Sequence, residues 1–216
     1  MNKSPNDKLL AREKIEHQLR DLIITLELPP GNKISENDLI EKLNCGRTPL
    51  REALHRLSEE YLIISVPRRG ISIAELNITD YVQLIEAVSH LEGITAKLAA
   101  QRATVNELSQ LKKNIDEIES ALRNEKILSV VDLDFEFHYL ISKMARNRYL
   151  KDTVKRLHRL TSRFIYLAWK NGGHSVISLE EHQQIYEAIL NKDFKKAQQY
   201  TFEHTMKAKE RIINAL

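Results

Sequence analysis

Residues 39–62 read LIEKLNCGRTPLREALHRLSEEYL, and this stretch decides the fold of the first part of the chain. Arg47 and Arg51 are four residues apart, so a helix would place both on one face. The apolar residues form a separate stripe at spacings of three and four: Leu50, Ala53, Leu54 and Leu57. Thr48, followed by proline, predicts a helix over about 49–60 with the threonine as its N-cap. The free N–H groups at that end would suit a phosphate.

The segment before this helix helps to choose between two interpretations of it. A cationic face alone is equally typical of a solvated surface helix with no binding role. Upstream, however, residues 34–43 predict another short helix that is capped by Ser35. A tight turn at residues 44–46 joins the two helices, and this order predicts a helix-turn-helix.

The segment after this helix predicts a β-hairpin. Residues 62–66 and 70–74 are rich in β-branched side chains and flank the sequence PRRG, which would place two cations at the tip. A helix-turn-helix followed by a basic hairpin is a winged helix, so we expect binding to double-stranded DNA. The expected DNA contacts come from the second helix and the wing: Arg47, Thr48, Arg51, Arg68, Arg69 and Gly70.

Residues 12–75 resemble the DNA-binding domain of the GntR transcription regulators. Three segments carry the resemblance: LPPGNKISENDL, which begins at Leu28, then GRTPLREALHRL and RRGISIAEL. The family usually has serine where Gly46 stands and glycine where Tyr61 stands. Loss of the serine removes one phosphate or capping contact, while the arginines and the threonine of the second helix remain.

Composition is ordinary for a soluble protein: 216 residues, 42% hydrophobic and 29% charged. No apolar run is long enough for a transmembrane helix, and the first residues lack the apolar core of a signal peptide. The single cysteine fits a reducing compartment, so we expect a cytoplasmic protein. The net charge of +3 is small, and residues 1–75 hold twelve basic and twelve acidic side chains. Because the positive charge is only local, we expect DNA binding by a homodimer.

The rest of the chain predicts a second, all-helical domain. The fold class is therefore mainly α, with a winged helix-turn-helix at 1–75, a linker at 76–80 and an antiparallel helical bundle at 81–216. Besides a first helix at 8–27, the expected helices are 79–101, 104–124, 126–146, 148–171, 178–191 and 193–214. Two of them begin with capping-box pairs, Thr104 with Glu107 and Ser178 with Glu181.

One aspartate and three histidines of the bundle form a candidate metal site. Asp134 and His138 are four residues apart on one helix, while His182 and His204 lie on the last two helices. Three neutral imidazoles and a carboxylate suit zinc, nickel or another borderline divalent ion. The alternative is that these histidines are ordinary surface or core residues, since the chain has eight. The other five have no comparable spacing and are assigned no site: His17, His55, His90, His158 and His174.

Residues 79–214 resemble the FCD ligand-sensing domain of the FadR-like GntR regulators. The resemblance rests on DLDFEFHYLISKMARNRYL and EEHQQIYEAILNKDFKKAQQYTFEHTMKAKERI. It implies a divalent metal, with zinc or nickel expected, held by Asp134, His138, His182 and His204.

The resemblance also implies a carboxylate effector, but with one departure. The family often places an arginine on the first bundle helix to hold the carboxylate, and Val88 stands near that position. Arg163 is the expected substitute as an effector-binding residue, and a structural role is the alternative for it. Tyr166 and Trp169 could line the effector pocket, although core packing is the commoner role of such residues.

These observations predict a transcription regulator, expected to be a repressor, and not an enzyme. A homodimer would place two recognition helices on a pseudo-palindromic operator, and a small organic acid near the metal would change DNA affinity. One alternative is a metal-dependent hydrolase or other metalloenzyme in which the His/Asp site activates water. No general base is tied to the four residues by a recognisable spacing. A third interpretation gives the metal a purely structural role between helices.

Overall fold

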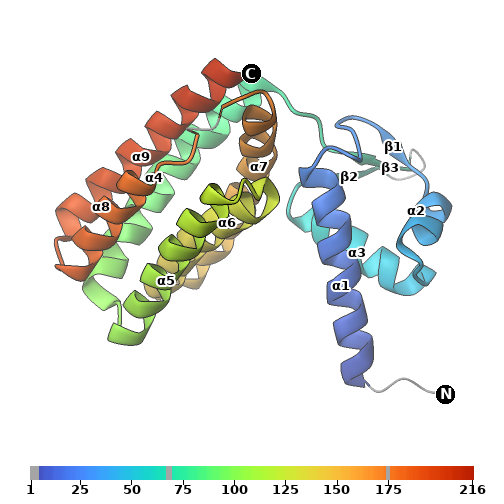
Figure 1. The fold of residues 1–216 in the computed structure, drawn as a ribbon. Helices are drawn as coiled ribbons and strands as arrows, with labels where there is room; N and C mark the ends of the chain where they lie inside the picture. The colour runs from blue at the N-terminus through green and yellow to red at the C-terminus, as the bar shows by residue number, and fades with distance from the viewer. Residues whose placement is uncertain (1–4, 67–69, 174–175) are drawn as a thin grey trace. The chain divides into compact units, whose positions relative to one another are not determined.

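The computed structural model describes residues 5–66, 70–173 and 176–216, and shows α1 side chains from residue 13 onward. The chain divides into two compact units, Met1–Leu76 and Asn77–Leu216, which are described separately. Helices predominate in both units (Figure 1). No helix within the described ranges has the length and apolar character needed to cross a membrane.

The first unit is a winged helix, as the sequence predicts. Its elements are α1 (Pro5–Ile24), β1 (Lys33–Ile34), α2 (Glu36–Leu43), α3 (Arg47–Glu59), β2 (Ile63–Val66) and β3 (Gly70–Ile73). The strands form an antiparallel sheet in the order β1-β3-β2, with Ile64 opposite Ser72 in the hairpin. The short strand β1 was not expected from the sequence, because two residues carry no alternating pattern.

Helices α1 and α3 pack together and bury the apolar stripe of α3. A chain of charges also joins them. Arg20 donates to Glu16 at 2.8 Å and to the buried Glu60 at 3.0 Å, and Arg56 donates to Glu16 at 3.1 Å. Burial alone would raise the pKa of Glu16, but the two arginines lower it below its usual value. Arg56 thus helps to hold α3 against α1.

The start of α3 differs from the prediction. The N-cap is Gly46, which has no side chain to cap with, and Thr48 lies inside the first helical turn. Ser35 is the N-cap of α2, as expected, and accepts a hydrogen bond from the backbone of Asp38. The helix begins two residues earlier than the sequence indicated, so Arg47 becomes the first residue of α3.

The second unit is an all-helical bundle, which confirms the predicted fold class. Its helices are α4 (Ile78–Arg102), α5 (Val105–Arg123), α6 (Ile127–Met144), α7 (Arg148–Lys170), α8 (Leu179–Leu190) and α9 (Phe194–Ala215). The helix α4 begins within the stretch expected as a linker, because Asn77 caps it by accepting from the N–H groups of Thr79 and Asp80. The other boundaries lie within two residues of those predicted.

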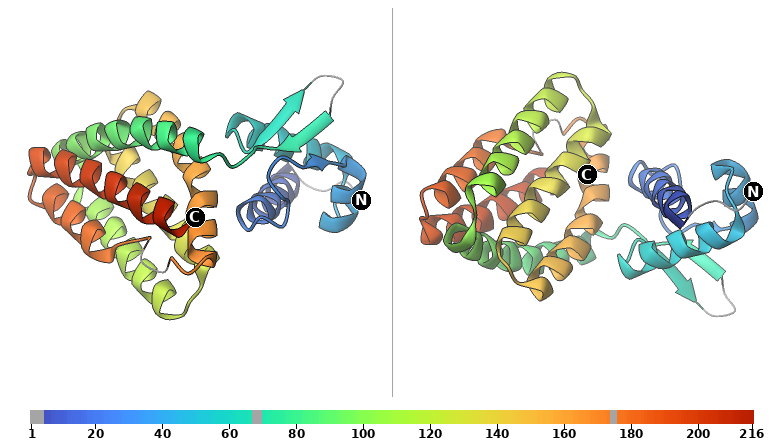
Figure 2. Two further views of the ribbon diagram at one scale, coloured as in Figure 1. Left: turned by 90° about the horizontal axis from the view of Figure 1, so that it is seen from above. Right: turned by 90° about the horizontal axis from the view of Figure 1, so that it is seen from below.

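The long helix α4 contacts four other helices: α6, α7, α8 and α9. It runs beside α9 for much of its length (Figure 1, Figure 2). Gly93 permits this approach, since a Cβ there would lie 3.2 Å from the carbonyl oxygen of Gln198. The side chains that α4, α6, α7, α8 and α9 send inward therefore meet in one buried region of the bundle.

Candidate functional site

The DNA-reading residues predicted on α3 are exposed and held by α2. Arg51 donates through Nε to both carboxylate oxygens of Glu36, at 2.9 and 3.2 Å. Arg47 donates to the side-chain oxygen of Asn37 at 3.1 Å. The bond from Arg51 uses only Nε, so its two terminal nitrogens can still form the paired contact that guanidinium groups make with guanine or phosphate. Thr48 is exposed beside them.

The wing is described only in part. Arg68 and Arg69 lie outside the described residues, so their predicted DNA contacts stay predictions. Gly70 begins β3, is exposed and has a φ of 91°, a conformation that side chains other than glycine rarely adopt. Glycine therefore allows the hairpin to enter its second strand at this position.

The four residues predicted to bind a metal lie together inside the bundle. His138 on α6, His182 on α8 and His204 on α9 place their nearest ring nitrogens within 4.8 Å of one another. All three are at most 4% exposed. Asp134 lies one turn before His138 on α6, and its Oδ1 is 3.4 Å from Nε2 of His182. Three helices thus bring three imidazoles and one carboxylate to one point.

In two of these histidines, a neighbouring carboxylate occupies one ring nitrogen and so determines which nitrogen is available to a metal. Nδ1 of His138 lies 3.1 Å from Oε1 of Glu92, and Nδ1 of His204 lies 2.8 Å from Oε2 of Glu181. Burial alone would raise the pKa of Glu181, but His204 and Arg211 lower it to about 2. An ionised carboxylate only accepts hydrogen bonds, so Nδ1 of His204 donates to it and Nε2 is the ring nitrogen left for a metal. Carboxylates orient metal-binding histidines in this way.

His182 provides the test of whether the residues fit a metal. It is completely buried, and neither ring nitrogen has a hydrogen-bond partner among the described residues. Burial lowers its pKa well below the usual value, so the imidazole is neutral. Its ring stacks on Phe137, with the ring centroids 4.1 Å apart. A buried imidazole without a partner is costly, and a cation beside Asp134 would satisfy its Nε2. The residues therefore fit a divalent ion.

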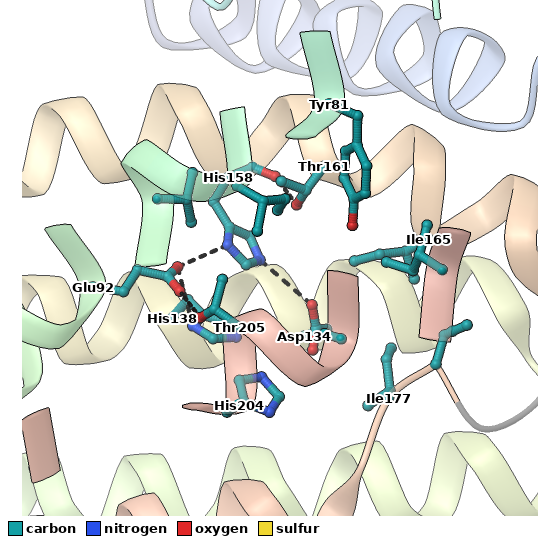
Figure 3. Close-up of a pocket in the computed structure, with 15 residues that line it drawn as sticks. Tyr81, Glu92, Asp134, His138, His158, Thr161, Ile165, Ile177, His204 and Thr205 are labelled. Atoms are coloured by element: carbon teal, nitrogen blue, oxygen red, sulfur yellow. Dashed lines mark hydrogen bonds and ion pairs between the residues drawn. The ribbon is translucent and has the colours of Figure 1, made fainter. Parts of the chain in front are cut away.

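His158 on α7 belongs to this cluster, although sequence reasoning assigned it no site. Its Nδ1 lies 2.8 Å from Oε1 of Glu92 and its Nε2 lies 3.4 Å from Oδ2 of Asp134 (Figure 3). Burial would lower its pKa, but Glu92 and Asp134 raise it above the usual value. Each ring nitrogen of His158 thus faces a carboxylate, and the ring links α7 to Asp134. Together with Glu92 and His138, it also forms a second group whose ligand atoms lie within 4.8 Å of one another and could hold a metal ion.

No sequence signal indicated His158 or Glu92, because 66 residues separate them. Glu92 is 2% exposed and joins three partners: His138, His158 and the hydroxyl of Thr205, which donates to it at 3.0 Å. Histidines 138 and 158 keep the pKa of Glu92 well below its usual value despite the opposing effect of burial. A buried charge of this kind requires several partners that only the folded bundle assembles.

A small cavity lies against the cluster, with about 30 Å³ of space open to the centre of a water molecule (Figure 3). Its polar walls come from Glu92, Asp134, His138, His158, Thr161, His204 and Thr205. Val88 lines it from α4, at the position where the resembling family often has arginine. Arg163, Tyr166 and Trp169 are not among the described lining residues. Arg163 is 2% exposed, and burial lowers its pKa to about 10. Its position therefore gives no support to the predicted effector contact.

Comparison with known proteins follows this division of the chain. Residues 11–73 match the bacterial regulatory proteins of the gntR family, and residues 83–206 match the FCD domain. The chain belongs to the GntR family and carries an FCD domain. The matched families contain transcription regulators rather than enzymes, which agrees with the expected class.

Relatives of this GntR-family chain are similar over nearly their whole length. YdhC of Bacillus subtilis, an HTH-type transcriptional regulator, is 28% identical over 87% of this chain and 84% of its own. RspR of Escherichia coli, an HTH-type transcriptional repressor, is 25% identical over 94% of this chain and 89% of its own. The solved structure of E. coli McbR/YncC covers 94% of this chain and 97% of its own with a TM-score of 0.80 at 17% identity, and so shares the fold.

Proposed function

We propose that this GntR-family regulator is a homodimeric repressor that acts in the cytoplasm and releases its operator when a small organic acid binds the helical domain. Repressors among its relatives, RspR and GlaR, support the proposed sense of regulation. The buried cluster of His138, His182 and His204 beside a cavity is the observation that carries the proposal, because it gives the second domain a place for metal and ligand.

On the DNA side, each protomer would place α3 in the major groove of one half of a pseudo-palindromic operator. Arg47 and Arg51 would contact base edges or phosphates, and Thr48 would bind the DNA backbone through its hydroxyl. Arg68, Arg69 and Gly70 would bring the wing to the neighbouring groove. The exposure of Arg47 and Arg51 supports this assignment, as do their bonds to side chains of α2, which hold both arginines in place.

In the helical domain, Asp134, His138, His182 and His204 would hold the divalent ion, with zinc or nickel expected. The ion would supply a positive charge beside the cavity that attracts a carboxylate. His158 holds Asp134 in place, while Glu92 and Glu181 fix the rings of His138 and His204. Because Val88 stands near the position of the expected arginine and the described lining contains no arginine or lysine, this charge would be the main attraction for an acid.

A bound acid can change DNA affinity only if it stabilises one arrangement of the two DNA-binding units over another. A chelator separates this role from two others. EDTA should remove the ion and alter operator affinity while the helical content of the protein, measured by circular dichroism, stays unchanged. Unfolding of the bundle by EDTA would indicate a structural metal instead. Turnover of a metabolite that disappears in His138→Ala would indicate an enzyme.

A further inference from the structure

The hydroxyl group of Tyr81 is buried at the wall of the cavity without a hydrogen-bond partner. Tyr81 stands in the first turns of α4 and is 1% exposed. Among the described residues nothing accepts from or donates to its hydroxyl oxygen. Figure 3 shows the hydroxyl pointing into the space between Asp134 and Ile165. The group is thus aimed at the place where a ligand would lie.

The ring of Tyr81 is held firmly, so the direction of its hydroxyl is determined by packing. It stacks on Phe164 of α7, with ring centroids 4.3 Å apart and planes 29° apart. Burial raises the pKa of Tyr81 well above its usual value, so the hydroxyl stays protonated and can donate. Native proteins pair nearly all buried polar groups, so an unpaired hydroxyl at a cavity wall calls for a partner such as a water, an ion or a ligand.

The remaining walls limit the kind of ligand. Seven of the described lining residues are apolar: Ile85, Val88, Ile165, Val176, Ile177, Ala208 and Ile212. The lining also includes Glu92 and Asp134, whose charges are already matched by buried histidines. No lysine or arginine is present among the lining residues that the structure describes. A second carboxylate on the ligand would therefore be buried without a cation, which is unfavourable.

We propose that Tyr81 selects the effector: its hydroxyl donates to a neutral acceptor oxygen on a largely apolar ligand that carries no more than one carboxylate. The ligand class is thus a short oxo- or ester-bearing monocarboxylic acid rather than a dicarboxylic or tricarboxylic acid. This proposal rests on the proposed function, because it takes the cavity to be the site where the effector binds.

The test compares pentanoate, 4-oxopentanoate and glutarate, together with the next two homologues of each. Binding to the full-length, zinc-loaded protein is measured by calorimetry without DNA. In at least one set, the oxo acid should bind about five-fold more tightly than the plain acid, as one net hydrogen bond predicts, and the diacid should bind least. In Tyr81→Phe, which keeps the ring and its stacking on Phe164, the oxo acid and the plain acid should bind equally.

Controls exclude a general effect of losing a hydroxyl. Tyr186→Phe, at a half-buried tyrosine outside the cavity lining, should keep the five-fold difference. Thermal unfolding of ligand-free Tyr81→Phe should occur at or above the wild-type temperature, because the variant removes an unpaired buried group. The proposal is overturned if no probe binds, if the diacid binds best, or if the preference for the oxo acid survives in Tyr81→Phe. If the oxo acid binds as expected but leaves DNA affinity unchanged, the role of Tyr81 stands and the proposed function fails.

Discussion

Glu181 and His204 form a link between α8 and α9: the carboxylate accepts from Nδ1 of the imidazole at 2.8 Å. Arg211 holds the same carboxylate with bonds of 2.9 and 2.7 Å. Glu181 is also the residue that would complete a capping box with Ser178, but its carboxylate faces His204 instead. Ser178 still accepts from the backbone N–H of Glu181, so only half of the expected box forms. The carboxylate of Glu181 instead fixes the ring of His204, a candidate metal ligand.

Glu181→Gln should weaken zinc binding about ten-fold, because a neutral amide orients His204 and raises its basicity less well than a carboxylate. Competition with a chromophoric chelator measures the affinity. The matched control is Glu180→Gln, which removes the same charge from the exposed neighbour on α8. Equal zinc affinity in both variants would contradict the assignment of His204 as a ligand.

Tyr61→Gly should stabilise the winged-helix unit by about 1 kcal/mol. Tyr61 follows the C-terminus of α3 with a φ of 58°, and the backbone of Leu62 donates to Leu57 across it, as in a Schellman motif. Glycine adopts this left-handed conformation without the clash of a Cβ. Urea unfolding measures the gain. Tyr61→Ala keeps the Cβ and should give no such gain, so a similar effect of both changes would rule out relief of backbone strain.

Glu107 should make stability depend on pH in the acidic range. Hydrogen bonds from Arg146, and then from Thr104, lower its pKa from 4.5 to about 2. Because the folded pKa is the lower one, the stabilisation is complete above about pH 4.5 and is lost as the pH falls toward 2. Glu107→Gln should therefore lower the urea midpoint at pH 7 and have a smaller effect at pH 3. An equal effect at both values would show that the charge is unimportant.

The sequence predicted most of the fold because local signals agreed with tertiary packing. The capping pair Thr104 and Glu107 forms both of its bonds, and the apolar stripe of α3 is buried as its spacing indicated. The predicted start of α3 was wrong because a glycine N-cap leaves no side-chain signal in the sequence, whereas the Thr-Pro pair resembles a helix start. The difference of two residues changes Thr48 from a cap to an exposed residue of the helix.

The candidate site was predictable only where its residues share a helix or match a family pattern. Asp134 and His138 are one turn apart, so their common face follows from spacing. His158 and Glu92 reach the same cluster from α7 and α4 through packing that no spacing reveals. Tyr81 gave no signal either, since a tyrosine near a helix start is ordinary until its hydroxyl proves to be buried without a partner.

The central claim is that α3 reads a specific DNA sequence, and a measurement of operator affinity tests it most directly. Fragments selected from genomic DNA by the metal-loaded protein would supply the operator, and fluorescence anisotropy would give the affinity. Arg51→Ala should lose about 1–3 kcal/mol on the operator and much less on unrelated DNA. Arg123→Ala, an exposed position on α5, is the control and should bind like the wild type. Operator binding that is unchanged in Arg47→Ala/Arg51→Ala would contradict the account.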